Sequence, residues 1–220
     1  MNGVDVSTRY TMRSREMYQR YAIYIFRVVK AKMGNYLIFF PSYRFMEDVY
    51  QEFTQLLASD EEEMELVIQQ KHMDEEEREN FLRAFEMGRE KSLIGFGVLG
   101  GIFSEGIDLT NEKLIGTLII GTGLPQVCNE REILKSYFDQ KGLYGFDYAY
   151  RYPGMNKVLQ AAGRVIRTED DRGVILLLDE RFQREKGKEI FPKEWADCER
   201  CRLDIVEEKI RLFWEKQTDN

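Results

Sequence analysis

The chain has 220 residues, of which 43% are hydrophobic and 13% aromatic, so it can bury one substantial core and is not a disordered protein. Its formal net charge of −7 does not favour binding of the whole molecule to nucleic acid. The charge is nevertheless uneven, because residues 9–32 carry seven basic side chains against Glu16, whereas residues 60–79 carry ten acids against Lys71 and Arg78. The basic stretch suits contact with a phosphate backbone, and it suits an ordinary solvated helix face equally well.

The sequence gives no sign of secretion, of a membrane span or of a metal site. No secretory signal opens it, and the longest uncharged run, 114–129, is too short and too rich in glycine to cross a membrane. Three cysteines are a low and odd number, which suits a reducing compartment and predicts a cytoplasmic protein. Cys198 and Cys201 have the spacing of metal ligands, but a single pair with no histidine nearby is half a site.

Short apolar runs alternate with longer amphipathic ones along the whole chain. In chain order, the patterns predict a helix at 14–33, a strand at 36–40, a helix at 44–57, a strand at 65–69, a helix at 74–87, strands at 93–103 and 114–121, helices at 129–141 and 153–167, a strand at 173–178 and a surface helix at about 195–216. Asp74 and Glu77 predict a capping box at the start of the third helix. Glycines at 95, 97, 100 and 101 weaken the third strand and indicate close backbone approach or a bend.

Strands separated by helices indicate βαβ units, which give a parallel sheet with helices on both faces. We therefore predict one α/β domain over residues 1–220. Ligands of such sheets gather at the carboxyl ends of the strands. We expect three segments, 41–43, 104–108 and 160–167, to share that edge of the sheet.

The segment 160–167 has the side chains to clamp a triphosphate. If it is helical, Gln160, Arg164 and Arg167 lie on one face, and Gly163 leaves room for a close approach. Guanidinium groups are always charged and their geometry matches phosphate oxygens. The alternative is a solvated polar face, which is the ordinary explanation of an isolated Arg-x-x-Arg pattern.

The other two segments are less specific by themselves. Ser42 offers a hydroxyl group to a nucleic-acid phosphate, although a simple turn after Pro41 explains it as well. Gly106 permits a tight turn, and Asp108 can accept hydrogen bonds from a ribose or hold an arginine. Gly-x-Asp is nevertheless a common pattern.

Together the three segments resemble motifs of a known family. The sequences YLIFFPSY at 36–43, LGGIFSEGIDL at 99–109 and QAAGRVIRTEDDRG at 160–173 resemble motifs IV, V and VI of superfamily 2 helicases. They are most similar to the DinG/XPD branch of DNA helicases, and the resemblance covers about residues 6–182. It implies that the chain is the second RecA-like lobe of a motor.

The resemblance also implies roles for individual residues. Arg164 and Arg167 would reach the γ-phosphate of ATP as arginine fingers, with Gln160 organising that contact. Gly106 and Asp108 would lie beside the nucleotide, and Glu105 would couple the nucleotide side to the DNA side. The residues implied to contact single-stranded DNA are Ser42, Tyr43 and Ser104, with Tyr43 able to stack on a base.

One motif of a complete motor is missing from the sequence. No Gly-x-x-x-x-Gly-Lys-Ser/Thr P-loop is present, so ATP and Mg²⁺ would be held mainly by a first lobe outside this chain. The run LLLDE at 176–180 is therefore not a Walker B strand, and we expect Asp179 to cap the next turn. The iron–sulfur cysteines of the family belong to its first lobe, and none of Cys128, Cys198 and Cys201 matches them. A cluster is therefore expected only in the parent protein, if at all, and not in this chain.

These observations predict the C-terminal motor lobe of an ATP-dependent DNA helicase, part of a longer protein and inactive alone. Its partners would be single-stranded DNA and the first RecA-like lobe of the same polypeptide. The alternative is a non-catalytic module that binds nucleic acid or a partner on the same scaffold. A Rossmann-type enzyme would need Gly-x-Gly-x-x-Gly after the first strand, and Gly95-Phe-Gly97 lies late and lacks the third glycine.

Overall fold

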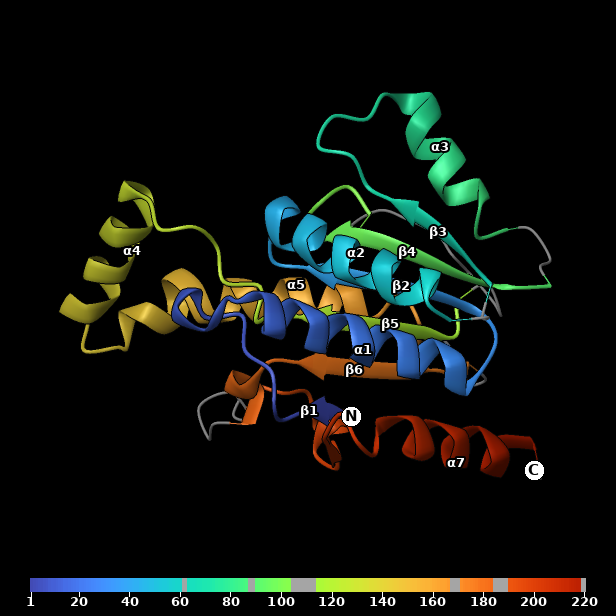
Figure 1. The fold of residues 1–220 in the computed structure, drawn as a ribbon. Coiled ribbons are helices and arrows are strands. Elements are labelled where there is room, and N and C mark those ends of the chain that lie inside the picture. Colours follow the sequence, from blue (N-terminus) through green and yellow to red (C-terminus); the bar gives the residue numbers. More distant parts are fainter. Residues whose placement is uncertain (61–62, 87–89, 104–113, 167–170, 184–189, 219–220) are drawn as a thin grey trace.

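Seven parallel strands form one sheet in the computed structural model, which describes residues 1–60, 63–86, 90–103, 114–166, 171–183 and 190–218 (Figure 1). The described strands are β1 (Asn2–Gly3), β2 (Asn35–Phe40), β3 (Met64–Ile68), β4 (Ser92–Val98), β5 (Gly116–Ile120), β6 (Val174–Leu178) and β7 (Arg200–Cys201). Their order across the sheet is β3-β4-β2-β5-β6-β1-β7, and every neighbouring pair is parallel. The prediction of a parallel α/β sheet is confirmed.

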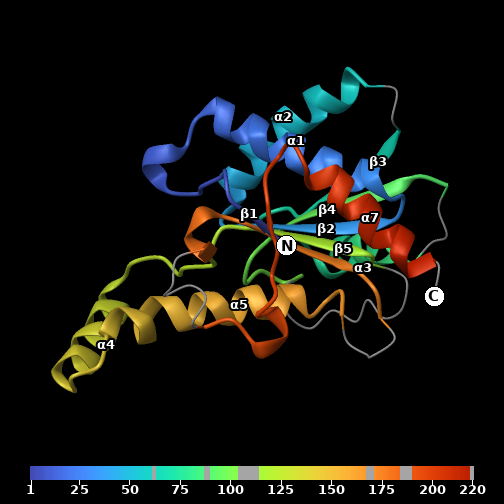
Figure 2. The same ribbon diagram turned by 90° about the horizontal axis from the view of Figure 1, so that it is seen from below.

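Helices cover both faces of this sheet (Figure 2). One face is covered by α1 (Arg15–Ala31), α2 (Tyr43–Ala58) and α7 (Val206–Thr218), and the other by α3 (Glu75–Arg83) and α5 (Tyr152–Ala162). Strand β2 lies near the middle and serves both layers, because its side chains alternate: Tyr36 and Ile38 face α1, whereas Leu37 and Phe39 face α5. Burial on both faces explains why residues 36–40, where a strand is predicted, are all apolar.

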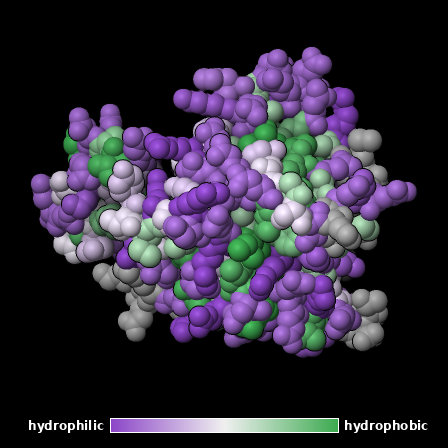
Figure 3. Space-filling model, viewed as in Figure 1, coloured by the Kyte–Doolittle hydropathy of each residue, from purple (hydrophilic) through white to green (hydrophobic). Residues whose placement is uncertain are grey.

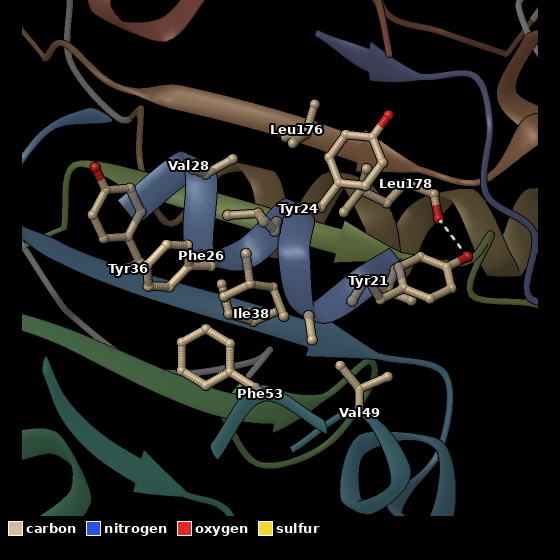
Figure 4. Close-up of a cluster of buried hydrophobic side chains, with 14 of the residues drawn as sticks. Tyr21, Tyr24, Phe26, Val28, Tyr36, Ile38, Val49, Phe53, Leu176 and Leu178 are labelled. Carbon is tan, nitrogen blue, oxygen red and sulfur yellow. Dashed lines mark hydrogen bonds between the residues drawn. The ribbon is translucent and has the colours of Figure 1, made fainter. Parts of the chain in front are cut away.

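The larger of the two cores lies between α1, α2 and the sheet (Figure 4). Tyr21, Tyr24, Ile25 and Val28 of α1 are fully buried there, as the helical spacing predicts. The hydroxyl group of Tyr21 donates a hydrogen bond to the carbonyl oxygen of Leu178 at 3.4 Å, which ties α1 to the end of β6.

Several elements end earlier than the sequence predicts. The third predicted strand stops at Val98 rather than at residue 103, because a tight turn follows it. The amide of Gly101 donates to the carbonyl oxygen of Val98 at 2.9 Å, and Gly100 has a φ of +70°, which favours glycine. Likewise α3 ends at Arg83, although its capping box is present as predicted: Asp74 accepts from the Glu77 amide at 2.8 Å and Glu77 accepts from the Asp74 amide at 2.9 Å.

The helix α4 (Asn129–Gln140) projects from the body as an arm (Figure 1). None of its residues is buried, and its main packing partner is the π-helical turn Asp147–Arg151 that leads into α5. Hydrogen bonds hold these two segments together, from Arg131 to the carbonyl oxygen of Ala149 at 2.6 Å and from Tyr150 to Glu132 at 2.5 Å. Hydrophobic residues appear on the surface of this arm (Figure 3).

Candidate functional site

The carboxyl ends of β2, β3 and β4 bring together the residues that follow these strands. Ser42 is half-buried and caps α2, because its hydroxyl oxygen accepts from the amide of Phe45 at 3.3 Å. Tyr43 follows it, and its hydroxyl oxygen accepts from Nε2 of Gln69 at 2.8 Å. Burial raises the pKa of Tyr43, so this hydroxyl stays neutral at physiological pH. Both residues lie at the edge of the sheet where the sequence places them.

The loop after β4 begins at the same edge. Its first residues form the turn at Gly100 and Gly101, and Nζ of Lys157 lies 2.9 Å from the position that a Cβ on Gly100 would take. Four predicted site residues follow shortly afterwards, and they lie outside the described residues: Ser104, Glu105, Gly106 and Asp108.

The predicted phosphate clamp lies on and after α5. Gln160 is exposed on the last turn of this helix, and Gly163 is exposed just beyond its end. Arg164 is half-buried in the turn that follows, where its amide donates to the carbonyl oxygen of Ala161 at 3.3 Å. The second arginine, Arg167, lies outside the described residues.

Arg164 and the serine–tyrosine pair lie at opposite edges of the sheet. A Cβ on Gly123, just after β5, would lie 2.5 Å from the carbonyl oxygen of Gly154, so α5 starts at the carboxyl edge (Figure 2). A Cβ on Gly173, just before β6, would lie 2.2 Å from Cγ1 of Val165 and 3.0 Å from the carbonyl oxygen of Ile115. Because Ile115 and Gly173 precede parallel strands, Val165 and its neighbour Arg164 lie near the amino edge.

The expectation that all three segments share one edge is therefore wrong. A helix that connects parallel strands runs back across the sheet, so its last turn lies where the next strand starts. Segment 160–167 precedes β6 directly, and this position already implied the amino edge. The molecule thus has two candidate sites, one at each end of its strands.

A buried polar cluster lies at the carboxyl edge, and the sequence predicts only its central residue, Asp179. Asp179 accepts from the Arg181 amide at 3.0 Å, which confirms that it caps the turn Glu180–Gln183. It also accepts from the amide and hydroxyl of Thr8, at 3.0 and 2.7 Å, and from Nε of Arg181 at 2.7 Å. Burial acts to raise the pKa of Asp179, but the hydrogen bonds and charge of Arg181 outweigh it and lower the pKa overall.

The basic stretch at residues 9–32 is mostly engaged within the protein. Arg15 pairs with Glu52 at 2.8 Å, and Nη1 of Arg27 donates to the carbonyl oxygen of Leu203 at 2.6 Å. The other pairs are Arg9 with Glu180 at 3.2 Å, Arg20 with Asp5, and Lys30 with Asp60 at 3.6 Å. These contacts favour the ordinary helix face over a phosphate-binding surface for this stretch.

The described part of the chain shows neither a metal-binding cluster nor a membrane-spanning helix. Its cysteines Cys128, Cys198 and Cys201 are free thiols, and none of the described His, Cys, Asp and Glu residues form a cluster suited to a metal ion. No described helix is long and apolar enough to cross a bilayer.

Known proteins similar to this chain include members of one helicase family. The helicase C-terminal domain family matches residues 25–198. The chain is 30% identical over 187 residues to the ATP-dependent DNA helicase XPD of Sulfolobus acidocaldarius, which covers 82% of this chain and 31% of that protein. It is 28% identical over 196 residues to the general transcription and DNA repair factor IIH helicase subunit XPD/RAD3 of Saccharomyces cerevisiae, with coverages of 84% and 24%.

A comparison of folds agrees with these sequences. A solved structure described as XPD_APO superposes with a TM-score of 0.72 at 25% identity, covering 91% of this chain and 39% of that one. The chain spans less than a third of the length of each of the two curated relatives. The match over most of its length and the RecA-like sheet lead to one conclusion: this chain belongs to the helicase C-terminal domain family of the XPD/Rad3/DinG helicases.

Proposed function

We propose that residues 1–220 form the second lobe of an ATP-dependent DNA helicase, in which ATP hydrolysis in a cleft between two lobes drives movement along single-stranded DNA and duplex unwinding. The observation that carries this proposal is the separation of the two candidate sites. Ser42 and Tyr43 lie at the carboxyl edge of the sheet, and Arg164 lies near the amino edge. A strand and a nucleotide can therefore be bound at the same time without competing for one surface.

At the amino edge, the proposal gives the arginines the central role. Arg164 and Arg167 neutralise charge that develops on the γ-phosphate of ATP bound by the first lobe, and Gln160 orients them. Gly106 and Asp108 border the same nucleotide, and Glu105 links it to the DNA side. The half-buried position of Arg164 fits this role, because partial burial limits the solvent screening of its charge. Mg²⁺ would accompany the ATP in the first lobe.

At the carboxyl edge, Ser42, Tyr43 and Ser104 contact the single strand. The ring of Tyr43 is half-buried and its hydroxyl is held by Gln69, so the ring has a fixed direction. A fixed aromatic ring loses little entropy when a base stacks on it, and stacking does not depend on the identity of the base. This suits a motor that moves along any sequence.

The arginines provide the test in the longer protein that contains both lobes. We expect Arg164→Ala or Arg167→Ala to lower DNA-stimulated ATP hydrolysis by about 10³–10⁵-fold, because each removes an arginine finger. Binding of labelled single-stranded DNA should stay within about twofold of wild type. Steady-state phosphate release and fluorescence anisotropy measure the two quantities.

Arg211→Ala is the matched control, since Arg211 lies on α7, outside the three motif segments. It should hydrolyse ATP like the wild type, and the 220-residue chain alone should not hydrolyse ATP at all. Wild-type activity in both arginine variants would contradict the proposal. DNA binding by a two-lobe protein that has no ATPase activity would instead favour the non-catalytic module.

A further inference from the structure

A groove opens among the carboxyl ends of β2, β3 and β4, beyond the residues that the sequence motifs indicate. Its volume is about 560 Å³, which is within the range of about 300–1,000 Å³ for small-ligand sites. Tyr43 lines it from the side of α2, and the turn after β4 lines it with Gly100, Gly101 and Ile102. The remaining lining residues come from the segment after β3 and from α3: Gln69, Gln70, Lys71, His72, Met73, Asp74 and Arg78.

The floor of the groove is fixed by one buried side chain. Gln69 is 2% exposed, and its Oε1 accepts from the amide of Val98 at 2.9 Å while its Nε2 donates to the hydroxyl of Tyr43 at 2.8 Å. A Cβ on Gly101 would lie 2.9 Å from the same Nε2, so only glycine lets the loop come this close. Gln69 therefore joins the ends of three strands, and the groove exists before any ligand binds.

The charge around the groove is positive in spite of the acidic segment nearby. Lys71, in the segment after β3, and Arg78, on α3, are exposed and line the groove. Nζ of Lys157 lies close to the turn at Gly100. Asp74 is the acid that lines the groove, and one of its oxygens accepts the Glu77 amide in the capping box. The exposed acids that follow on α3 do not line it: Glu75, Glu76 and Glu79.

We propose that this groove binds a phosphodiester unit of the single strand, with Lys71 and Arg78 neutralising its charge. The inference rests on the proposed function, since it extends the strand from Ser42 and Tyr43 across the end of β4 to the end of β3. Phosphate is the matching group because exposed cations over a backbone turn attract an anion without reading a base. The site would thus add affinity and no sequence preference.

Salt dependence is the measurement that isolates such a contact. Each phosphate neutralised on a single strand contributes about 0.7 to the slope of log affinity against log salt concentration. The double variant Lys71→Gln/Arg78→Gln should lower the slope by about 0.7 and weaken binding by about fivefold at about 0.1 M salt, because it removes one phosphate contact. The probe is a labelled oligothymidylate of about 15 nucleotides, and anisotropy is recorded from about 50 to 200 mM salt.

The matched control removes two cations from α7, which lies toward the opposite side of the sheet. Lys209→Gln/Arg211→Gln changes the net charge equally, and it should leave the slope unchanged because these side chains pair with Glu199 and Glu207. All four positions are on the surface of the protein, and circular dichroism verifies that both variants fold. An equal loss of affinity in both double variants would mean that only the net charge of the protein matters. That result would refute the groove as a binding site.

Other outcomes separate the groove from the function on which it rests. An unchanged slope in the Lys71/Arg78 variant, with tight binding by the wild type, would refute the groove and leave the helicase lobe intact. A wild-type two-lobe protein that binds no single strand would contradict both proposals. If inorganic phosphate weakens strand binding equally in the wild type and in the Lys71/Arg78 variant, the anion binds outside the groove. That result would refute the groove as a phosphate site.

Discussion

Asp179 shows how a single carboxylate holds the carboxyl edge of the sheet together. It is fully buried, and Arg181 is its charged partner. Thr8 donates twice to the same carboxylate, so the segment after β1 is attached to the end of β6. The side chain of Arg181 also donates to the hydroxyl of Thr8 at 2.5 Å. Each of these three residues thus contacts the other two.

We expect Arg181→Ala to lower the free energy of unfolding by about 3–5 kcal/mol, because it leaves a buried carboxylate without its counter-charge. Urea denaturation followed by circular dichroism measures this loss. Exposed Arg172→Ala should change stability by less than about 0.5 kcal/mol. Equal stabilities of the two variants would show that Asp179 does not depend on Arg181.

The pH dependence of this cluster has a definite sign. The pKa of Asp179 is lowered in the folded protein, so its contribution is fully present above the unfolded value of about 3.9. The contribution is lost as the pH falls through the folded pKa. The stability difference between wild type and Asp179→Asn should therefore shrink below about pH 4.

At the scale of the elements, α5 decides where the candidate sites lie. Its first turn touches the loop after β5, where a Cβ on Gly154 would lie 2.7 Å from the carbonyl oxygen of Thr122. This contact fixes the start of the helix at the carboxyl edge, and eleven helical residues then carry the chain toward the amino edge. The position of Arg164 follows from this direction.

Gly154→Ala tests the contact, because two effects oppose each other. Alanine favours a helix over glycine by about 1 kcal/mol, whereas the clash with backbone atoms costs about 1–3 kcal/mol. We expect net destabilisation, measured as a lower midpoint in urea. Gly142→Ala is the control, since a Cβ there meets nothing within 4 Å and only its φ of +76° is unfavourable. A more stable Gly154→Ala variant would refute the close contact.

The sequence predicts those elements whose signal is local. The apolar run of β2 and the capping box of α3 are each determined by residues within the element itself, and both are confirmed. β1 and β7 were missed because two residues such as Asn2–Gly3 show no periodicity and become strands only through their neighbours. Gln69 was missed for a similar reason, since its partners Tyr43 and Val98 are far from it in sequence.

At the scale of the whole molecule, the two tryptophans report on opposite layers. Trp214 packs against the core beside α1, and Trp195 packs against the core beside α5. If residues 1–220 form one domain, as we propose, both layers should unfold together. The single-tryptophan variants Trp195→Phe and Trp214→Phe should then give the same urea midpoint by fluorescence and by circular dichroism. Two separate midpoints would mean that the two layers are independent units.

The lateral borders of the sheet bear on how the protein behaves at high concentration. Outer strands present unpaired backbone groups and are templates for aggregation. β7 offers only two residues, and β3 carries Glu65 within it and follows the acids Asp60 and Glu63. Like charges on two copies repel each other, so these acids discourage the sheet from growing by intermolecular pairing. The negative charge of the chain is thereby placed where it protects solubility.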